Sequence, residues 1–343
     1  MNILVTGNLG YIGSVLTPML RDRNYSIVGL DIGYFRDCKL FDFNEDFSQI
    51  IKDIRDITSS DLTNIDTVIH LAGLSNDPVG EINSDVTFSI NFDSTVHLVK
   101  LAKENGVSRF IFASTQSIYG ISNSNVELDE YESVKNPITA YAKSKWLAEQ
   151  EIFKQKSDKF CIVSLRFSTV FGISPRLRTD IVFNNLMVNG FLYNEIKIYS
   201  DGTPWRPLVH VNDACNAILA CIDAPDQLIN GRIFNVGYRE GNYTVLELAK
   251  QVQRLIHGSK IFVVDEKIKD NRTYKVSFER IHTELSQYFN TQYSITKGAE
   301  ELFNFLIRNK FSNDDLLGNK CIRLKQLNFL RSQGIIDGEL RFT

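Results

Sequence analysis

Two groups of residues in this 343-residue chain have the types and spacing of a redox site. One is a Tyr-x-x-x-Lys pair, Tyr141 and Lys145, in a segment with a helical pattern after Pro137. Residues four apart share one face of a helix, so the phenol and the ammonium lie together. Such a lysine lowers the pKa of a tyrosine from about 10, and the positive nicotinamide ring of an oxidised dinucleotide, if one binds there, adds to this effect. The phenol can then exchange a proton with an alcohol that is being oxidised. The alternative is a solvent-facing pair, because this spacing also occurs by chance.

The second group lies at the start of the chain, where a short apolar run breaks into glycines spaced GxxGxxG and a helical pattern follows. Strand, glycine turn and helix form the opening of a dinucleotide-binding unit. Glycine lets the backbone turn tightly and approach a pyrophosphate, and the N–H groups of the helix start face its charge. The loop residues expected to contact the cofactor are Gly7, Gly10, Tyr11, Ile12 and Gly13.

Acidic and small residues follow the next strands at positions suited to the same cofactor. Asp31 ends the second strand about 20 residues after the glycines, where ribose hydroxyls lie. A carboxylate there favours NAD over NADP, because it repels a 2′-phosphate. Asp53 and Ile54 end the third strand and are assigned to the adenine, the alternative being an acid-rich strand end. Leu71 ends the fourth strand, and the small residues Ala72 and Gly73 that follow it let the backbone pass close to the cofactor; all three are expected to contact it.

Polar residues further along complete the candidate site. Asn91 lies on a helix expected from about 84 to 105, and the alternative for it is a polar surface position. The fifth strand, 109–114, delivers Ser114 and Thr115 at its carboxyl end, where ligands bind in open α/β sheets.

Composition places the chain among ordinary globular proteins. The net charge of −3 gives no reason to expect nucleic acid, and the five cysteines show neither CxxC nor ligand spacing with the histidines. No metal is therefore expected. The chain begins with a strand, so no signal peptide is expected, and no apolar run approaches the ~20 residues of a membrane span. We predict a cytoplasmic protein.

Strands and helices alternate through the first half, which predicts an α/β fold with a doubly wound parallel sheet of the Rossmann type. The alternation breaks after the sixth strand, 161–166. We expect an NAD-binding domain over 1–166, to which roughly 205–232 returns. A smaller α/β substrate domain is expected over 167–204 and 233–343, with C-terminal helices.

The motifs resemble, in order, those of the extended short-chain dehydrogenase/reductase family, the NAD-dependent nucleotide-sugar epimerases and dehydratases. The resemblance covers Met1 to about Glu284. The residues that carry it are Thr6 to Gly13, Asp53 to Arg55, His70 to Gly73, Asn91, Ser114 with Thr115, Tyr119 with Gly120, Tyr141 to Lys145, Leu165 to Phe167, Trp205 to Val211, Phe234 to Gly237 and Asp270 to Tyr274.

This resemblance implies Thr115, Tyr141 and Lys145 as a catalytic trio that oxidises a sugar carbon, commonly C4, with NAD. It implies a homodimer built on helices near 84–105 and 138–156, and a nucleoside-diphosphate sugar as substrate. Besides the residues already assigned to it, NAD is expected to contact Asn91, Ser114, Tyr141, Lys145 and Phe167. The substrate is expected to contact Ser75, Thr115, Gln116, Thr169, Arg178, Arg206 and Arg272.

Two departures from the family pattern narrow the reaction. Gln116 and Ser117 replace the Asp-Glu pair of the dehydratases, so 4,6-dehydration is not expected. Thr169 stands where many epimerases carry asparagine. The leading hypothesis is an NAD-dependent nucleotide-sugar epimerase. The alternatives are a net dehydrogenase or ketoreductase of the same substrate class and, more remotely, a non-catalytic nucleotide sensor.

Overall fold

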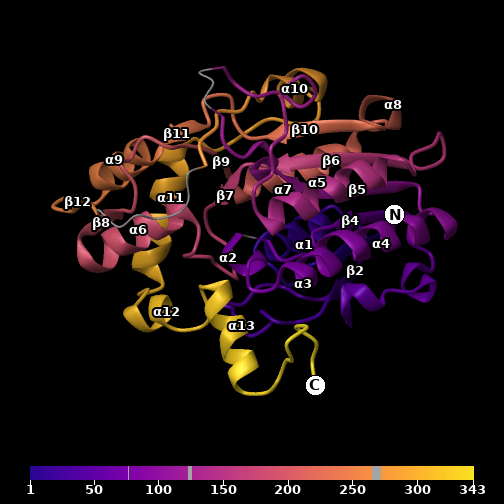
Figure 1. Ribbon diagram of the computed structural model, residues 1–343, viewed down its shortest axis with the longest axis horizontal. Coiled ribbons are helices and arrows are strands. Elements are labelled where there is room, and N and C mark those ends of the chain that lie inside the picture. The colour runs from indigo at the N-terminus through magenta and orange to yellow at the C-terminus, as the bar shows by residue number, and fades with distance from the viewer. Residues whose placement is uncertain (76, 123–125, 265–271) are drawn as a thin grey trace.

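The computed structural model describes residues 1–75, 77–122, 126–264 and 272–343, and its centre is a seven-stranded parallel sheet (Figure 1). The strand order is β10-β6-β5-β4-β1-β2-β3. In chain order the strands are β1 (Asn2–Thr6), β2 (Ser26–Asp31), β3 (Ser48–Ile51), β4 (Thr67–His70), β5 (Arg109–Thr115), β6 (Cys161–Phe167) and β10 (Arg232–Val236). The order reverses direction between β1 and β4, which places a ligand crevice at the carboxyl ends of these strands. The predicted doubly wound α/β fold is confirmed.

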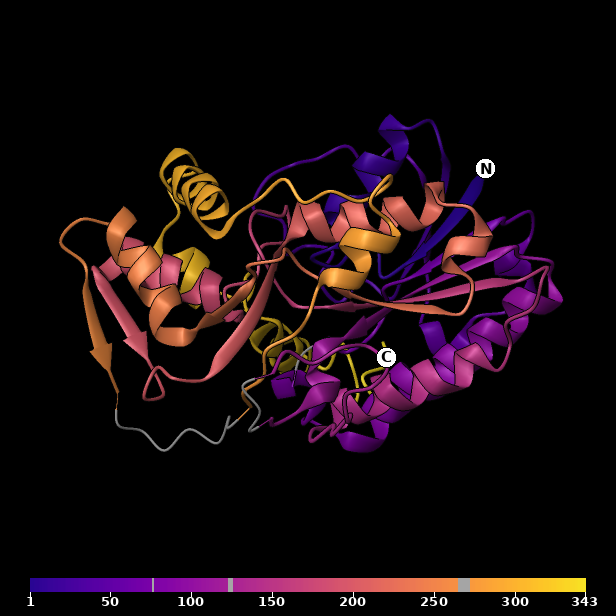
Figure 2. The ribbon, with the colours of Figure 1, turned by 90° about the horizontal axis from the view of Figure 1, so that it is seen from above.

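Helices cover both faces of this sheet because successive strand residues point to opposite sides. In β1, Ile3 and Val5 pack into one core and Leu4 into the other. The first core includes α1 (Gly13–Asp22), α7 (Val211–Asp223) and α10 (Glu279–Glu284). The second includes α3 (Ser84–Phe88), α4 (Ser94–Glu104), α5 (Ala140–Phe153) and α13 (Arg323–Ser332). Figure 2 shows the two helical layers on either side of the strands.

A smaller lobe, at the left of Figure 1, has its own core. It contains a three-stranded sheet, β11-β9-β7, and a two-stranded sheet, β12-β8. Its elements are β7 (Thr169–Phe171), α6 (Val182–Tyr193), β8 (Glu195–Ile198), β9 (Trp205–His210), β11 (Asn242–Thr244), α9 (Val245–Leu255), β12 (Lys260–Val263), α11 (Ile295–Arg308) and α12 (Asn313–Leu317). Two short helices, α2 (Asp77–Gly80) and α8 (Asp226–Ile229), lie in connections.

The observed elements differ from the expected domain boundaries in three places. The returning segment was expected over 205–232, but β9 belongs to the small sheet and the seventh strand of the large sheet is β10. The helices α10 and α13 were assigned to the substrate domain, yet Ile281 packs into the first core of the large sheet and Leu327 and Leu330 into the second. These differences arise from contacts between distant segments, which no local pattern reports. The division into two domains stays a prediction.

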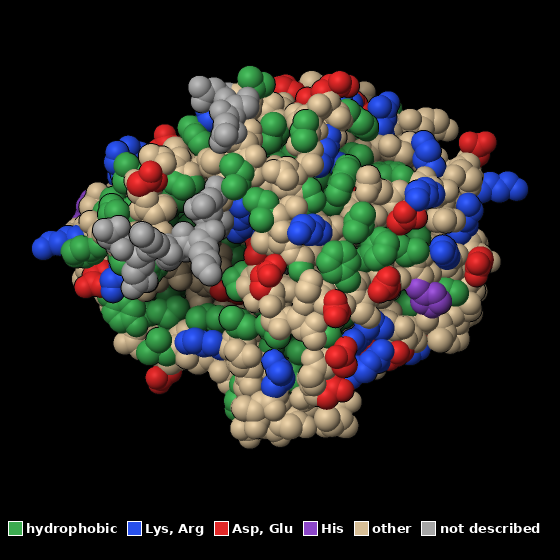
Figure 3. All heavy atoms as spheres, viewed as in Figure 1, with side chains coloured by type: hydrophobic (Ala, Val, Ile, Leu, Met, Phe, Trp, Pro, Cys, Tyr) green, Lys and Arg blue, Asp and Glu red, His purple; other side chains and the backbone are tan. Residues whose placement is uncertain are grey.

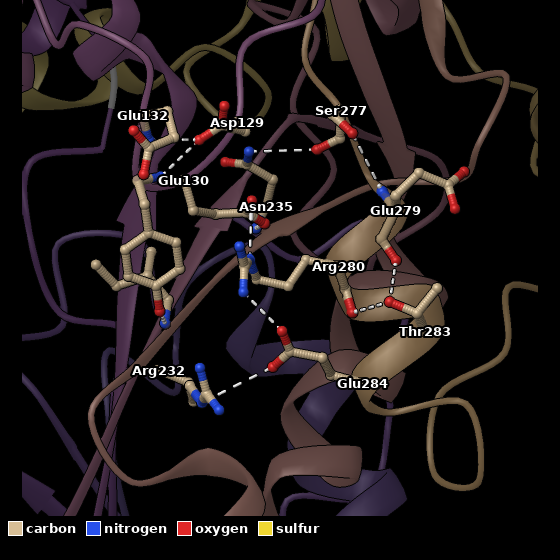
Figure 4. Close-up of polar contacts among 12 residues, drawn as sticks. Asp129, Glu130, Glu132, Arg232, Asn235, Ser277, Glu279, Arg280, Thr283 and Glu284 are labelled. Carbon is tan, nitrogen blue, oxygen red and sulfur yellow. Dashed lines mark hydrogen bonds and ion pairs between the residues drawn. The ribbon is translucent and has the colours of Figure 1, made fainter.

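A cluster of charged residues fixes β10 and α10 to the loop before α5 (Figure 4). The Asn235 N–H donates to Glu130 Oε1 at 2.8 Å. Arg280 bridges two carboxylates, with Nε 3.4 Å from Glu130 Oε2 and Nη1 2.6 Å from Glu284 Oε1. These contacts hold the late seventh strand in place beside β6.

The surface carries acidic and basic side chains in mixture rather than in one patch, as the face in Figure 3 shows. All five cysteines are buried and free. Among the described residues, no helix combines the length and apolar character of a membrane span.

Candidate active site

A cavity of about 560 Å³ runs along the carboxyl edge of the large sheet and continues between the two lobes. Almost every residue predicted for the cofactor lines it, from the glycine loop to Phe167. This is the crevice that the reversal of strand order between β1 and β4 creates.

The glycine loop has the geometry of a phosphate cradle. Gly7 has φ +75°, and a Cβ there would lie 2.6 Å from Ala72 N. A Cβ on Gly13 would lie 2.5 Å from the Gly7 carbonyl oxygen. Only glycine fits this close approach of β1, the α1 start and the turn after β4. The N-terminus of α1 therefore opens on the cavity, as an anion site requires.

Asp31 is fixed at the end of β2 by two backbone donors. Its Oδ1 accepts from Gly33 N at 2.8 Å and its Oδ2 from Leu9 N at 3.1 Å. Burial raises the pKa of this carboxyl. Asp53 and Ile54 also line the cavity, and the Asp53 carboxylate is paired with Arg55, Nη2 to Oδ2 at 2.5 Å.

We expect the protein to bind NAD at least tenfold more tightly than NADP, because the half-buried Asp31 carboxylate would repel a 2′-phosphate and little water is present to screen the two negative charges. Asp31→Ser removes that carboxylate and should reduce the ratio of NAD affinity to NADP affinity. Titration of each dinucleotide by calorimetry measures both values. Tighter binding of NADP to the unaltered protein would refute this role of Asp31.

The three residues of the predicted catalytic trio line the cavity together. Thr115 ends β5, and Tyr141 and Lys145 lie in the first turns of α5, which Thr139 caps by accepting from Ala142 N at 3.2 Å. The Lys145 ammonium donates to the Ala113 carbonyl at 2.9 Å and lies 4.6 Å from the centre of the Phe112 ring.

The electrostatics of the trio differ from the expectation. Burial raises the pKa of Tyr141 to about 12, although Thr115 and Arg178 act to lower it. Burial also lowers the pKa of Lys145 to about 7. The predicted lowering of the tyrosine pKa is therefore absent in the chain by itself, because desolvation of both groups outweighs their proximity.

The lowered pKa of Lys145 predicts a pH dependence of stability. An unfolded lysine titrates at about 10.4, so between pH 7 and that value the unfolded chain binds more protons, and the free energy of unfolding rises with pH. We expect the melting temperature, measured without cofactor, to rise from pH 7 to pH 9 relative to that of Lys145→Met. Parallel curves for the two proteins would show that Lys145 is charged when folded.

Two predicted site residues do not line the cavity. Asn91 is fully buried, accepts from Leu74 N at 2.8 Å and donates to Leu74 O at 3.1 Å, so it holds the backbone after Gly73 from behind. Gln116 turns away toward the sheet, where Nε2 donates to Arg166 O at 3.0 Å. Neither residue lines the cavity, so contact of Asn91 with the cofactor and of Gln116 with the substrate stays a prediction.

The predicted substrate residues line the part of the cavity beside the smaller lobe, apart from Gln116. Arg178 is 6% exposed; its Nε lies 2.9 Å from Asp180 Oδ1, and its Nη1 donates to Ser75 Oγ at 3.1 Å. The Arg206 and Arg272 side chains line the cavity together with Thr169 on β7. The resulting wall is basic, as binding of a diphosphate requires. Of the motif that contains Arg272, Asp270 and Asn271 lie outside the described residues.

The structure adds cavity residues that the sequence reasoning missed. Tyr274 stands two positions after Arg272 in a motif that had been singled out, so it could have been found. Three other lining residues have no sequence pattern that would mark them as part of a site. They are Asp77, which pairs with Arg272, and Lys197 and Tyr199, in and just after β8. Arg323 enters from α13, almost at the other end of the chain.

The fold and the site define the class: a Rossmann-type dinucleotide-dependent enzyme with a buried Thr/Tyr/Lys trio. Residues 3–237 match the model of the "NAD dependent epimerase/dehydratase family". The chain belongs to this family, and the family resemblance and the NAD cofactor predicted from the sequence are confirmed.

Individual relatives agree. An uncharacterized UDP-glucose epimerase of Bacillus subtilis (strain 168) is 30% identical over 254 residues, 70% of this chain and 78% of the relative. UDP-glucuronic acid decarboxylase 3 of Arabidopsis thaliana is 27% identical over 80% of each chain. The fold matches a UDP-glucose 4-epimerase of Thermotoga maritima (TM-score 0.79, 21% identity, 90% of this chain and all of that one). It also matches a UDP-glucuronic acid 4-epimerase of Bacillus cereus with UDP-glucuronic acid and NAD (TM-score 0.76, 24% identity, 90% and 99%).

The residues present fit this cofactor. The glycine loop packs so closely on β1 and the turn after β4 that a Cβ on Gly7 or Gly13 would collide with backbone, and the Ser114 hydroxyl, buried in the cavity wall, has no hydrogen-bond partner among the described residues. An unpaired buried hydroxyl is costly, so a ligand partner for it is expected.

Proposed function

We propose that this protein is an NAD-dependent epimerase of a nucleoside-diphosphate sugar, most simply a UDP-sugar, that acts by transient oxidation at C4. The observation that carries the proposal is the convergence of Thr115, Tyr141 and Lys145 at the end of β5, beside a basic wall formed with Arg178, Arg206 and Arg272. The relatives named for UDP-sugars support the nucleotide.

The residues divide the work by position. Tyr141 takes the proton from the sugar hydroxyl at its phenol oxygen, and Thr115 holds the same hydroxyl. Lys145, held by the Ala113 carbonyl, favours the phenolate whenever it carries its proton, because a nearby opposite charge stabilises the ionised tyrosine. The chemistry that NAD supplies when bound is reversible acceptance of a hydride from the sugar carbon. Arg206 and Arg272 grip the diphosphate, since planar guanidinium donors bind two oxygens at once.

Epimerisation, rather than net oxidation, requires that the keto sugar turn over and receive the hydride on its other face. The roomy cavity between the lobes is compatible with such a rotation. Gln116 and Ser117 offer no acid or base near neutral pH, which supports simple epimerisation over dehydration.

A proton NMR time course tests the proposal. Protein and NAD⁺ are mixed in turn with UDP-, GDP-, CDP- and dTDP-linked sugars, including UDP-glucose and UDP-glucuronic acid, while NADH absorbance is followed. A new epimer without accumulating NADH is the expected result. Stoichiometric NADH with a keto sugar would make the protein a net dehydrogenase. Release of CO₂ with a pentose product would make it a decarboxylase. The homodimer stays a prediction, and sedimentation as a monomer at micromolar concentration would contradict it.

A further inference from the structure

The C-terminal segment, 319–343, lies beyond the residues matched by the family model and packs against the cofactor side of the molecule. Arg55 Nη1 donates to Glu339 O at 2.9 Å, and Arg341 Nη1 lies 2.7 Å from Asp56 Oδ2. The Tyr34 phenol donates to the Leu340 carbonyl. The segment, seen below the two lobes in Figure 1, is thus fixed to the loops after β2 and β3, which the sequence assigns to adenosine.

Arg323, the first residue of α13, extends from this segment into the cavity wall. It is 3% exposed, and its guanidinium lies 4.3 Å from the centre of the Phe35 ring. Its Nη2 donates to Arg176 O at 2.9 Å and its Nη1 to Lys320 O at 3.4 Å. A guanidinium has five N–H donors, so these two neutral carbonyls leave donors for a ligand.

Among the described residues Arg323 has no ion pair of its own, although Asp180, which pairs with Arg178, lies near it and accepts from its backbone N–H. Arg176 Nη2 lies 3.0 Å from Glu45 Oε1, and Arg178 is paired with Asp180. Within the described part of the chain, no carboxylate lies within 4.0 Å of the Arg323 guanidinium. Burial and the neighbouring Arg178 lower the pKa of Arg323 to about 10, which still leaves it charged at neutral pH. A buried cation of this kind is costly without an anion.

The place of Arg323 selects the anion. Its carbonyl partner on Arg176 belongs to a segment that contacts the glycine loop and α1, with Ser174 Oγ donating to Tyr11 O and Arg176 Nη1 to Ser14 Oγ, each at 2.8 Å. Phe35, over whose ring the guanidinium lies, follows β2. Arg323 therefore lies in the cavity wall between the glycine loop and the loop after β2. In a dinucleotide bound to this cradle, that space is where the diphosphate joins the adenine-bearing ribose.

We propose that Arg323 binds the diphosphate of the cofactor opposite the glycine loop, so that NAD is held between the N-terminus of α1 and α13. The site then contains two anion-binding elements from opposite ends of the chain. The inference rests on the NAD dependence of the family and not on the identity of the sugar.

Calorimetry on the full chain, stripped of copurified cofactor, tests this contact. Arg323→Gln is expected to weaken NAD and ADP-ribose, which both contain the diphosphate, by about 10- to 100-fold, as for loss of a charge-assisted bidentate contact. Adenosine, which lacks phosphate, should bind the variant and the unaltered protein alike. Equal affinity of both proteins for NAD would overturn the proposal, and so would an equal loss for adenosine.

A matched control separates this contact from loosening of the helix. Gln326 lies one turn further along α13 and anchors it to the same loop, with Nε2 3.0 Å from Tyr34 O, but it does not line the cavity. Gln326→Ala should lower the melting temperature and leave the ratio of NAD to adenosine affinity unchanged. A change of this ratio as large as that in Arg323→Gln would assign the effect to the helix and overturn the proposal. If Arg323→Gln does not fold, Arg323→Lys replaces it, because lysine keeps the charge but cannot donate two parallel hydrogen bonds. Its affinity for NAD should lie below that of the unaltered protein, by less than the loss expected for Arg323→Gln. If Arg323→Lys and Gln326→Ala each bind NAD as tightly as the unaltered protein does, the proposal is refuted.

These readouts are independent of turnover. A protein that loses NAD affinity on Arg323→Gln but converts no sugar in the NMR panel would retain this inference and refute the proposed function.

Discussion

Tyr141→Phe is expected to lower turnover of the nucleotide sugar by about 10²- to 10⁴-fold, the range for removal of a general acid–base group. The phenol is the group of the trio to which the proposal assigns proton exchange with the sugar hydroxyl, while Thr115 holds that hydroxyl and Lys145 Nζ is engaged by the Ala113 carbonyl. The ring itself is kept in Tyr141→Phe, so the packing of α5 and the affinity for NAD should be almost unchanged.

The measurement combines steady-state turnover with NAD titration. Tyr238→Phe is a suitable control, because it removes a buried phenol, hydrogen-bonded to Tyr243, outside the cavity lining. Its turnover should stay near that of the unaltered protein. Near-normal activity of Tyr141→Phe would remove the basis of the catalytic assignment.

The parts of this site that the sequence predicted are those encoded locally. The glycine spacing, the acid at the end of β2 and the Tyr141–Lys145 pair depend on a few neighbouring residues and on the period of the helix or strand. Asp31 and Tyr141 therefore lie in one cavity, as expected. Asp31 ends a strand of the parallel sheet, and Tyr141 lies on a helix beside the carboxyl end of another strand.

Side-chain direction and distant contacts could not be predicted in the same way. Gln116 follows Thr115 directly, but the turn after β5 points its amide toward Arg166. Asn91 lies in a π-helical segment, Ser89–Asp93, within the expected helix, and faces Leu74. Arg323 reaches the cavity only because α13 crosses to the large sheet. Burial, which decides the pKa of Lys145, is likewise a property of the whole fold.

The second large effect concerns the support of the catalytic helix. Glu149, two turns after Tyr141 on α5, pairs with Arg166 on β6, with Arg166 Nη2 2.5 Å from Glu149 Oε1 and both side chains 1% exposed. Glu149 Oε2 also accepts from Ser164 Oγ at 2.7 Å. We expect Glu149→Ala to lower the free energy of unfolding by about 3–5 kcal/mol, because it leaves the Arg166 guanidinium buried and uncompensated.

Urea unfolding measures this loss, and a double variant identifies its cause. Glu149→Leu with Arg166→Met removes both charges and keeps apolar volume, so it should recover most of the stability that Glu149→Ala loses. Arg166 Nη1 also donates to Tyr119 Oη and to Glu130 O, each at 3.0 Å, so the recovery should be incomplete. If the double variant is no more stable than Glu149→Ala, the loss arises from packing and these hydrogen bonds. If instead it recovers stability but turnover stays low, the ion pair positions α5, and with it Tyr141 and Lys145, more than it stabilises the fold.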